Sequence, residues 1–454
     1  MPPTDSVFLL AESRQTPMHV GGLQLFRPPA DFPGTRELFK RLVSGTEVAP
    51  LFRKRPRRTL TSAGQWAWVD DTEFDIEHHV RHNALPAPSR VLELLSLCSR
   101  LHGIPLDRRR PLWEFHLIEG LADGRFAIYF KIHHALVDGV AAQRLLRSVL
   151  TDDPDARGLP APWAVQPRRP SARTDEHPRD LLAPLRGALE LATDAAGLPA
   201  ALTSALRRGL AEQGSPVSFG APRTMFNVPI SGARRFAAQS WPLARIRAVS
   251  GEAGATVNDV VLAMCSGALR RYLAGIGELP DQPLIAMVPV ALESRRDAGN
   301  AVGAVMCNLA THLADPADRL ATIRASMVGG KQALAAMTPL QIVALTGLGM
   351  SPLALQGVPG YTELFRPPFN VIISNVPGPR RPLYLDGARL DGLYPLSIPY
   401  HGQALNITCT SYGDELAFGL TGCRRTVPHL QYLLGFLDDE LADLERAVGL
   451  SSNA

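Results

Sequence analysis

Two adjacent histidines, His133 and His134, open the sequence HHALVDG, which closes with Asp138 and Gly139. A histidine ring titrates near neutral pH, so it can take a proton from a hydroxyl group and return it later. The preceding residues 126–132 (FAIYFKI) are rich in aromatic and β-branched types and predict a strand. Because side chains alternate along a strand, one histidine should face a substrate and the other should be structural. The segment therefore predicts acid–base chemistry at the end of a strand.

The residues after the histidines predict a corner between a strand and a helix. Residues 139–150 (GVAAQRLLRSVL) place their apolar side chains on one helical face. Asp138 precedes this helix, where a carboxylate caps free N–H groups or orients a histidine, and Gly139 permits close packing. A metal site formed by His133, His134 and Asp138 is the rival interpretation. Adjacent strand histidines diverge, however, and the same-face i, i+4 pair of histidines typical of such sites is missing.

The elements around this corner indicate a chain of several domains. Its 454 residues are too many for one ordinary core. Prolines between residues 151 and 170 indicate a linker, and a Leu-, Ala- and Arg-rich stretch at 180–213 predicts a crossover helix. We predict an N-terminal domain at 1–150, a linker with a crossover helix at 151–224 and a C-terminal domain at 225–454.

The C-terminal part carries clear local signals. Thr256 is a candidate N-cap of a helix, with Asp259 in its first turn. A hairpin should turn at Gly413 and Asp414. Further patterns predict three strands and a final amphipathic helix, at residues 284–292, 301–313, 369–376 and 429–448.

Composition excludes several classes of protein. Hydrophobic residues make up 46% and charged residues 20%, as in a folded globular protein. A net charge of +4 does not argue for nucleic acid. Five scattered cysteines without a CxxC pair suit a reducing cytosol, and we identify no signal peptide. Phosphate-binding glycine loops are not evident, so nucleotide cofactor chemistry has no support.

Two segments are candidates for contact with lipid. Residues 332–362 contain no charged residue and are long enough to span a bilayer, but Pro339, Pro352 and Pro359 interrupt them. A buried helical hairpin or the wall of a lipid channel is the better interpretation, with a plain pair of core helices as the alternative. The basic run at 52–58 (FRKRPRR) suits a solvated face, anionic lipid headgroups or the phosphates of CoA, and Arg108 to Arg110 suit the same partners.

A second His-His pair at His78 and His79 lacks a following Asp-Gly, so the pair alone is weak evidence. The whole segment KIHHALVDGV, however, resembles the HHxxxDG motif of the bacterial wax ester synthase/diacylglycerol acyltransferase family. Other segments resemble that family in the same order along the chain: residues 5–26, 110–121, 256–273, VPVALESR with the later GNAVG, and SNVPGPRRPLYLDGARL. The family belongs to the CoA-dependent acyltransferases. This resemblance implies a mixed α/β fold of two chloramphenicol-acetyltransferase-like domains with mixed sheets, joined by a helical crossover.

The resemblance also implies a reaction. His134 would act as general base and deprotonate a fatty alcohol or the free hydroxyl of diacylglycerol, whose oxygen then attacks the acyl-CoA thioester directly. His133 and Asp138 would support it, and no cofactor beyond the co-substrate acyl-CoA is implied. We further expect a cytoplasmic protein, a monomer or homodimer, in peripheral contact with a membrane or lipid-droplet surface.

Other positions are candidates through the same resemblance. Asn258 offers an amide that would polarise the thioester carbonyl, although first-turn helix residues such as Asn258 and Asp259 also satisfy backbone donors. Substrate-binding candidates are Gly139, Asp259, Ser374, Asn375 and Gly378. Met18 and His19 are weaker site candidates. The residues Pro111 to Trp113 are more often core or turn residues than ligand contacts. Two alternative functions stay open: a related acyltransferase with a smaller alcohol or amine acceptor, and a non-catalytic lipid-binding homologue.

Overall fold

The computed structural model describes most of the chain, in two compact units. The described residues are 3–45, 47–58, 66–137, 139–165, 220–291, 302–338, 341–342 and 366–450. Unit 1 comprises Met1–Pro167, Val228–Arg245 and Ser374–Leu434, and unit 2 comprises Arg168–Asn227, Ile246–Ile373 and Gly435–Ala454. Asp138, the predicted crossover helix at 180–213 and most of the uncharged stretch at 332–362 lie outside the described residues. The predicted domain boundaries stay a prediction.

Unit 1 contains a six-stranded mixed sheet in the order β11-β12-β1-β6-β5-β4. Its strands are β1 (His19–Arg27), β4 (Val80–Ala84), β5 (Trp113–Glu119), β6 (Phe126–His133), β11 (Tyr384–Leu385) and β12 (Ala388–Leu396). The predicted strand at 126–132 is therefore confirmed as β6. Strands β4 and β5 are parallel, whereas β6 is antiparallel to both β1 and β5.

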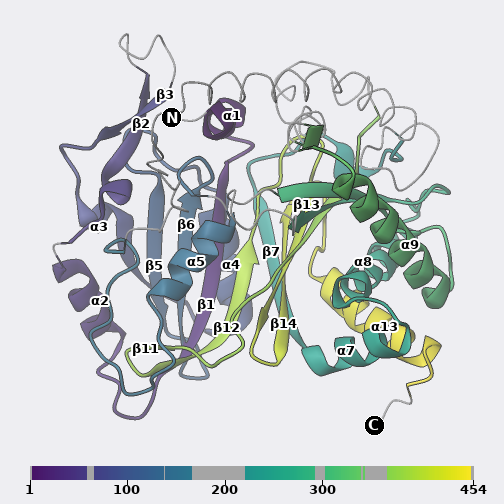
Figure 1. Ribbon diagram of the computed structural model, residues 1–454. Helices are drawn as coiled ribbons and strands as arrows, with labels where there is room; N and C mark the ends of the chain where they lie inside the picture. Colours follow the sequence, from purple (N-terminus) through teal and green to yellow (C-terminus); the bar gives the residue numbers. More distant parts are fainter. Residues whose placement is uncertain are drawn as a thin grey trace, which may run out of the picture. The chain divides into compact units, whose positions relative to one another are not determined.

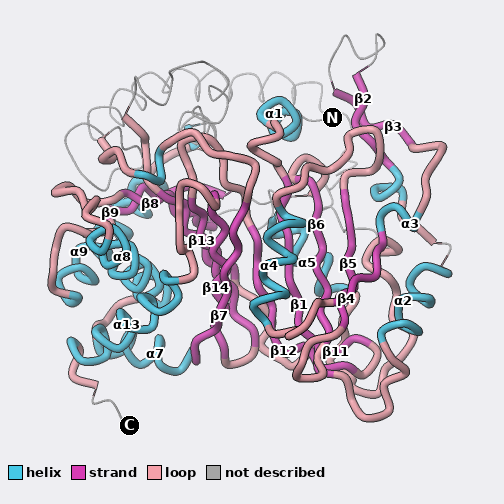
Figure 2. The backbone as a smooth tube through the Cα atoms, turned by 180° about the vertical axis from the view of Figure 1, so that it is seen from behind, coloured by secondary structure: helices cyan, strands magenta, loops and turns pink. Residues whose placement is uncertain are grey.

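Helices cover both faces of this sheet, α4 (Val91–His102) on one and α5 (Gly139–Ser148) on the other (Figures 1 and 2). Side chains of β6 alternate between the two layers. Phe130 belongs to the core cluster that includes α5, and Tyr129 to the cluster that includes α4. The alternation expected for a strand thus holds up to the point where the histidines begin.

The remaining elements of unit 1 surround this sheet. A hairpin of β13 (Leu405–Tyr412) and β14 (Glu415–Cys423) turns at Gly413, as predicted, and β14 pairs with β7 (Arg234–Pro242). The other elements are α1 (Pro3–Ala11), α2 (Thr35–Ser44), β2 (Lys54–Arg58), β3 (Trp66–Asp70) and α3 (Ile76–His79). The basic run forms β2, in which Arg57 and Arg58 are exposed.

Unit 2 combines strands with long helices. The strands are β8 (Ile285–Ala291), β9 (Val302–Asn308) and the start of β10 (Val371–Val376), and the helices are α7 (Leu243–Glu252), α8 (Val257–Gly275), α9 (Pro316–Ala335) and α13 (Tyr432–Ala447). Strand β8 pairs parallel to β10 and antiparallel to β9, so this sheet is mixed as well. The predicted strands at 284–292 and 369–376 and the C-terminal amphipathic helix are confirmed, whereas the strand predicted at 301–313 ends at Asn308. Leu437, Leu441 and Leu444 form the buried stripe of α13.

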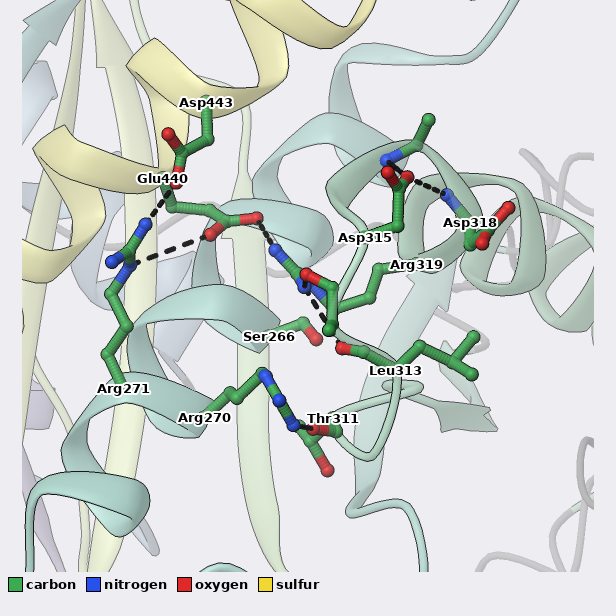
Figure 3. A network of polar contacts seen from close by, with 12 residues as sticks. Ser266, Arg270, Arg271, Thr311, Leu313, Asp315, Asp318, Arg319, Glu440 and Asp443 are labelled. Atoms are coloured by element: carbon green, nitrogen blue, oxygen red, sulfur yellow. Dashed lines mark hydrogen bonds and ion pairs between the residues drawn. The ribbon is translucent and has the colours of Figure 1, made fainter.

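A buried polar network joins the three long helices of unit 2 (Figure 3). Glu440 of α13, whose side chain is 1% exposed, pairs with Arg319 of α9 and lies 3.9 Å from Arg271 of α8. Arg271 also pairs with Asp443, one turn further along α13. Gly267 makes this packing possible, since a Cβ atom there would lie 1.9 Å from the Glu440 carboxyl carbon. The network is a structural clamp built from charged groups.

The structure bears on whether the chain could span a membrane. In the described part of the chain, no helix is both long and apolar enough to cross a membrane.

Candidate active site

The end of β6 is held by backbone hydrogen bonds from two other segments. The His133 N–H donates to the carbonyl oxygen of Leu112 at 3.0 Å, and the His134 N–H donates to that of Met18 at 2.9 Å. Both acceptor residues are fully buried. The segments around Met18 and Leu112, weaker candidates in the sequence, therefore fix the backbone on which both histidines sit.

The His133 ring is fully buried and its two nitrogens face different groups. Nδ1 accepts a hydrogen bond from the Ala135 N–H at 3.0 Å. A nitrogen that accepts carries no proton, so the ring proton is assigned to Nε2. That atom lies 3.4 Å from Oε1 of Glu12. His133 is thereby held as one tautomer, with both nitrogens directed at protein groups.

Glu12 follows α1, and its side chain is only 4% exposed. Its Oε1 accepts from the Met18 N–H at 3.2 Å, and its Oε2 accepts from Nε of Arg108 at 2.8 Å. Burial acts to raise the pKa of Glu12, but His133, the Met18 N–H and Arg108 together outweigh it and lower the pKa below the usual glutamate value. Glu12 is therefore ionised and joins the N-terminal segment to the histidine motif.

His134 is half-buried, and its ring stacks on Phe8 of α1 with ring centroids 4.1 Å apart. Phe8 in turn packs against a small apolar cluster of Leu9, Leu106, Leu112 and Ala135. The surroundings of the two histidines thus differ: His133 is fully buried next to the Ala135 N–H and Glu12, whereas the His134 ring is half-buried and stacks on Phe8.

The two other residues of the motif are placed unevenly by the structure. Gly139 is the first residue of α5, as the predicted strand-to-helix corner requires. Asp138 lies outside the described residues, so its predicted capping and supporting roles stay predictions. Among the described residues, no group of three or more His, Cys, Asp and Glu side chains is placed to hold a metal ion.

Asn258 and Asp259 lie in the first turn of α8, in unit 2. Thr256 is the N-cap, as predicted: its hydroxyl accepts from the Asp259 N–H at 3.2 Å, and Oδ2 of Asp259 accepts from the Thr256 N–H at 2.9 Å. This capping box occupies one oxygen of Asp259. The other, Oδ1, is buried without a hydrogen-bond partner among the described residues. Asn258 is half-buried, and the predicted roles of both side chains remain untested.

Ser374, Asn375 and Gly378 lie on β10 and the turn that follows. The Gly378 N–H donates to the Ser411 hydroxyl at 3.0 Å, and a Cβ atom at Gly378 would lie 1.7 Å from the Ser411 carbonyl oxygen. Gly378 is therefore required for the close approach to β13. Ser374 and Asn375 are half-buried, and their predicted contact with substrate stays a prediction.

Glu12, Phe8 and Arg108 were missed as site residues by sequence reasoning. Glu12 and Phe8 lie in the N-terminal segment that resembles the family, but nothing in their spacing indicates a contact with residues 133 and 134. For Arg108 the sequence suggests a solvated face, lipid headgroups or CoA phosphates, whereas its Nε donates to Glu12. The one available signal was an acidic residue directly after the apolar run at residues 7–11 (VFLLA).

Comparison with known protein families matches both parts of the chain. Residues 1–261 match the wax ester synthase/diacylglycerol acyltransferase catalytic domain, and residues 298–445 match the WS/DGAT C-terminal domain. The chain belongs to this family. A Mycobacterium tuberculosis relative named "Probable diacyglycerol O-acyltransferase tgs2" is 53% identical over 455 residues, covering 99% of each chain. The predicted family and the prediction of an acyltransferase enzyme are confirmed.

Solved structures agree on the fold. The wax ester synthase/diacylglycerol acyltransferase from Marinobacter aquaeolei is 43% identical to this member of the family, with a TM-score of 0.78 and 99% of each chain covered. The first condensation domain of the CDA synthetase matches with a TM-score of 0.57 at 15% identity, over 100% of this chain and 96% of that one. The second match concerns the fold alone. The predicted fold class, mixed α/β with mixed sheets on two chloramphenicol-acetyltransferase-like domains, is confirmed.

Proposed function

We propose that this enzyme transfers a long-chain acyl group from acyl-CoA to the hydroxyl of diacylglycerol or a fatty alcohol, with His134 as the general base. The observation that carries the proposal is the division of roles at the end of β6. His133 has Nδ1 engaged by Ala135 and Nε2 directed at Glu12, whereas the His134 ring lies against Phe8. Membership of the family, whose relatives are named for diacylglycerol acylation, supports this assignment.

The proposed reaction needs one group that accepts a proton and later gives it back. His134 takes the proton of the acceptor hydroxyl while the oxygen attacks the thioester carbonyl, forming a tetrahedral oxyanion. The carbon–sulfur bond then breaks, and the CoA thiolate takes the proton from His134. The products are the ester and free CoA, with no acyl-enzyme. Asn258 is proposed to donate a hydrogen bond to the oxyanion.

Turnover by the purified chain tests the proposal. A long-chain acyl-CoA is supplied with either diacylglycerol or hexadecanol, and release of free CoA is measured together with the ester formed. Product with diacylglycerol, hexadecanol or both supports a lipid acceptor and identifies it. Turnover only with a small alcohol or an amine would reassign the acceptor, and no turnover with any acceptor would refute the activity.

His134→Ala should lower kcat by about 10²–10⁴-fold, the usual loss for a general base. His78→Ala is the matched control, because His78 is also a half-buried member of a His-His pair. Full activity in His134→Ala would refute the mechanism, whichever acceptor is used.

A further inference from the structure

Unit 1 contains a cavity of about 870 Å³ whose lining is rich in arginine. It is lined by residues of α4, of the segment after α1 and of the loop before β7, and no residue of the histidine motif is among them. Five arginines are among its lining residues: Arg14, Arg100, Arg234, Arg235 and Arg424. Glu93 is the one acidic residue of the lining, and it already pairs with Arg90 at 3.0 Å. Arginines therefore outnumber acidic residues around the cavity by five to one.

None of these five arginines forms an ion pair with a carboxylate within the described part of the chain, and the Cys423 side chain favours the charged form of Arg234. Arg234 is 4% exposed, and its Nη2 donates to the carbonyl oxygens of Gln15 at 2.6 Å and Pro399 at 3.3 Å. Burial lowers the pKa of Arg234 to about 10, so it is still charged at neutral pH. A buried cation bound only by carbonyls strengthens the positive potential of a concave site.

The backbone around the cavity is tightly fitted. A Cβ atom at Gly232 would lie 2.8 Å from the Arg14 carbonyl oxygen, so only glycine permits this approach. The Arg14 backbone is thereby held next to the loop that leads into β7, whose first two residues are Arg234 and Arg235. Arg14, Arg100 and Arg424 are exposed, so their guanidinium groups are accessible to a ligand from solvent.

We propose that this cavity binds a phosphate-bearing anion with at least two negative charges. Guanidinium groups bind phosphate oxygens through paired N–H donors, and several around one cavity suit a diphosphate or a phosphate monoester better than a single carboxylate. The volume falls within the range of small-molecule sites. The same chemistry is carried by the phosphates of CoA, by an anionic phospholipid headgroup and by free pyrophosphate, and the experiment separates these sources.

Direct binding of inorganic pyrophosphate to the full chain is measured by calorimetry in low salt. The His134→Ala variant is used alongside the wild type, so that binding is judged without turnover and independently of the proposed function. Arg14→Gln and Arg424→Gln should each weaken pyrophosphate binding about tenfold, as expected for loss of one charge-assisted hydrogen bond. Both side chains are exposed, so these variants should fold.

Arg425→Gln is the matched control, because Arg425 is also exposed but does not line the cavity. Displacement of pyrophosphate by CoA would identify the coenzyme phosphates as the ligand. Displacement by phosphatidic acid in phosphatidylcholine vesicles, but not by phosphatidylcholine alone, would identify a headgroup, and binding displaced by neither would identify a free phosphate compound. No pyrophosphate binding by the wild type, or an equal loss in Arg425→Gln, overturns the proposal.

Discussion

Glu12 in unit 1 and Glu440 in unit 2 are both buried carboxylates that contact arginine, and their surroundings differ. Glu12 joins a backbone N–H, Arg108 and His133, next to the proposed base. Glu440 joins Arg319 and Arg271 on two helices, among residues with no proposed part in the reaction. The same side chain type thus serves to orient a histidine in one unit and to hold three helices together in the other.

The pKa values of these two glutamates are also shifted in opposite directions. Burial raises the pKa of Glu440, and Arg319 and Arg271 offset this only in part. Burial also acts to raise the pKa of Glu12, but the hydrogen bonds and charges around Glu12 lower its pKa below the usual value. The difference shows that the number and type of donors, rather than burial alone, decide whether a buried carboxylate favours its charged form.

Removal of the Glu440 carboxyl group should give the largest loss of stability. Glu440→Ala leaves Arg319, which is 3% exposed, without its hydrogen-bond acceptor and leaves a cavity between the helices, so the free energy of unfolding should fall by about 3–5 kcal/mol. Denaturant unfolding measures this, with Asp439→Ala, an exposed neighbour on α13, as control. A change in Glu440→Ala no larger than in the control would show that the network is not a clamp.

Glu12→Gln should act mainly on catalysis. Gln keeps an oxygen for the Met18 N–H but loses the charge facing His133 and Arg108, so we expect kcat to fall by about 10- to 100-fold with little change in KM. The pH profile of kcat should shift as well, because Glu12 acts as a positioning residue through His133. Glu37→Gln, an exposed carboxylate of unit 1, is the control. Unchanged kcat with lowered stability would make Glu12 purely structural.

Gly267→Ala tests the space that Glu440 occupies. The added Cβ would overlap the Glu440 carboxyl group, and overpacking of this kind costs about 1–3 kcal/mol. The double variant Gly267→Ala with Glu440→Ala should lose less than the sum of the two single changes, because the shortened side chain at position 440 removes the atoms that the new Cβ would overlap. Strict additivity would contradict the coupling.

The smallest expected effect is the pH dependence of stability at acid pH. The lowered pKa of Glu12 gives stability that is present above the usual glutamate pKa of 4.5 and is lost as pH falls through the folded value. The raised pKa of Glu440 gives the opposite: stability is greatest below 4.5 and declines as pH rises through the folded value. The difference in free energy of unfolding between wild type and Glu12→Gln should therefore change with pH in the opposite direction to the difference between wild type and Glu440→Gln. Each difference should change by less than about 1.4 kcal/mol per pH unit. Parallel slopes in denaturant unfolding would contradict the assigned directions.

The sequence by itself determined the features whose signal is local. The strand before His133, the corner at Gly139, the capping box of Thr256 and Asp259, and the hairpin at Gly413 all depend on residues a few positions apart. Periodicity, capping and turn chemistry act over such distances, so they can be identified in one sequence. The alternation of a strand likewise separated the two adjacent histidines before their surroundings were known.

Only the tertiary structure decided which distant groups meet. Glu12 and His133 are 121 positions apart, as are Arg319 and Glu440, and the arginine-lined cavity gathers residues from Arg14 to Arg424. Such contacts depend on strand order and helix packing, which set no fixed spacing along the chain. The sequence does not distinguish a buried carboxylate from an exposed one, because the pKa of each depends on the solvent and the hydrogen-bond donors that the folded chain places around it.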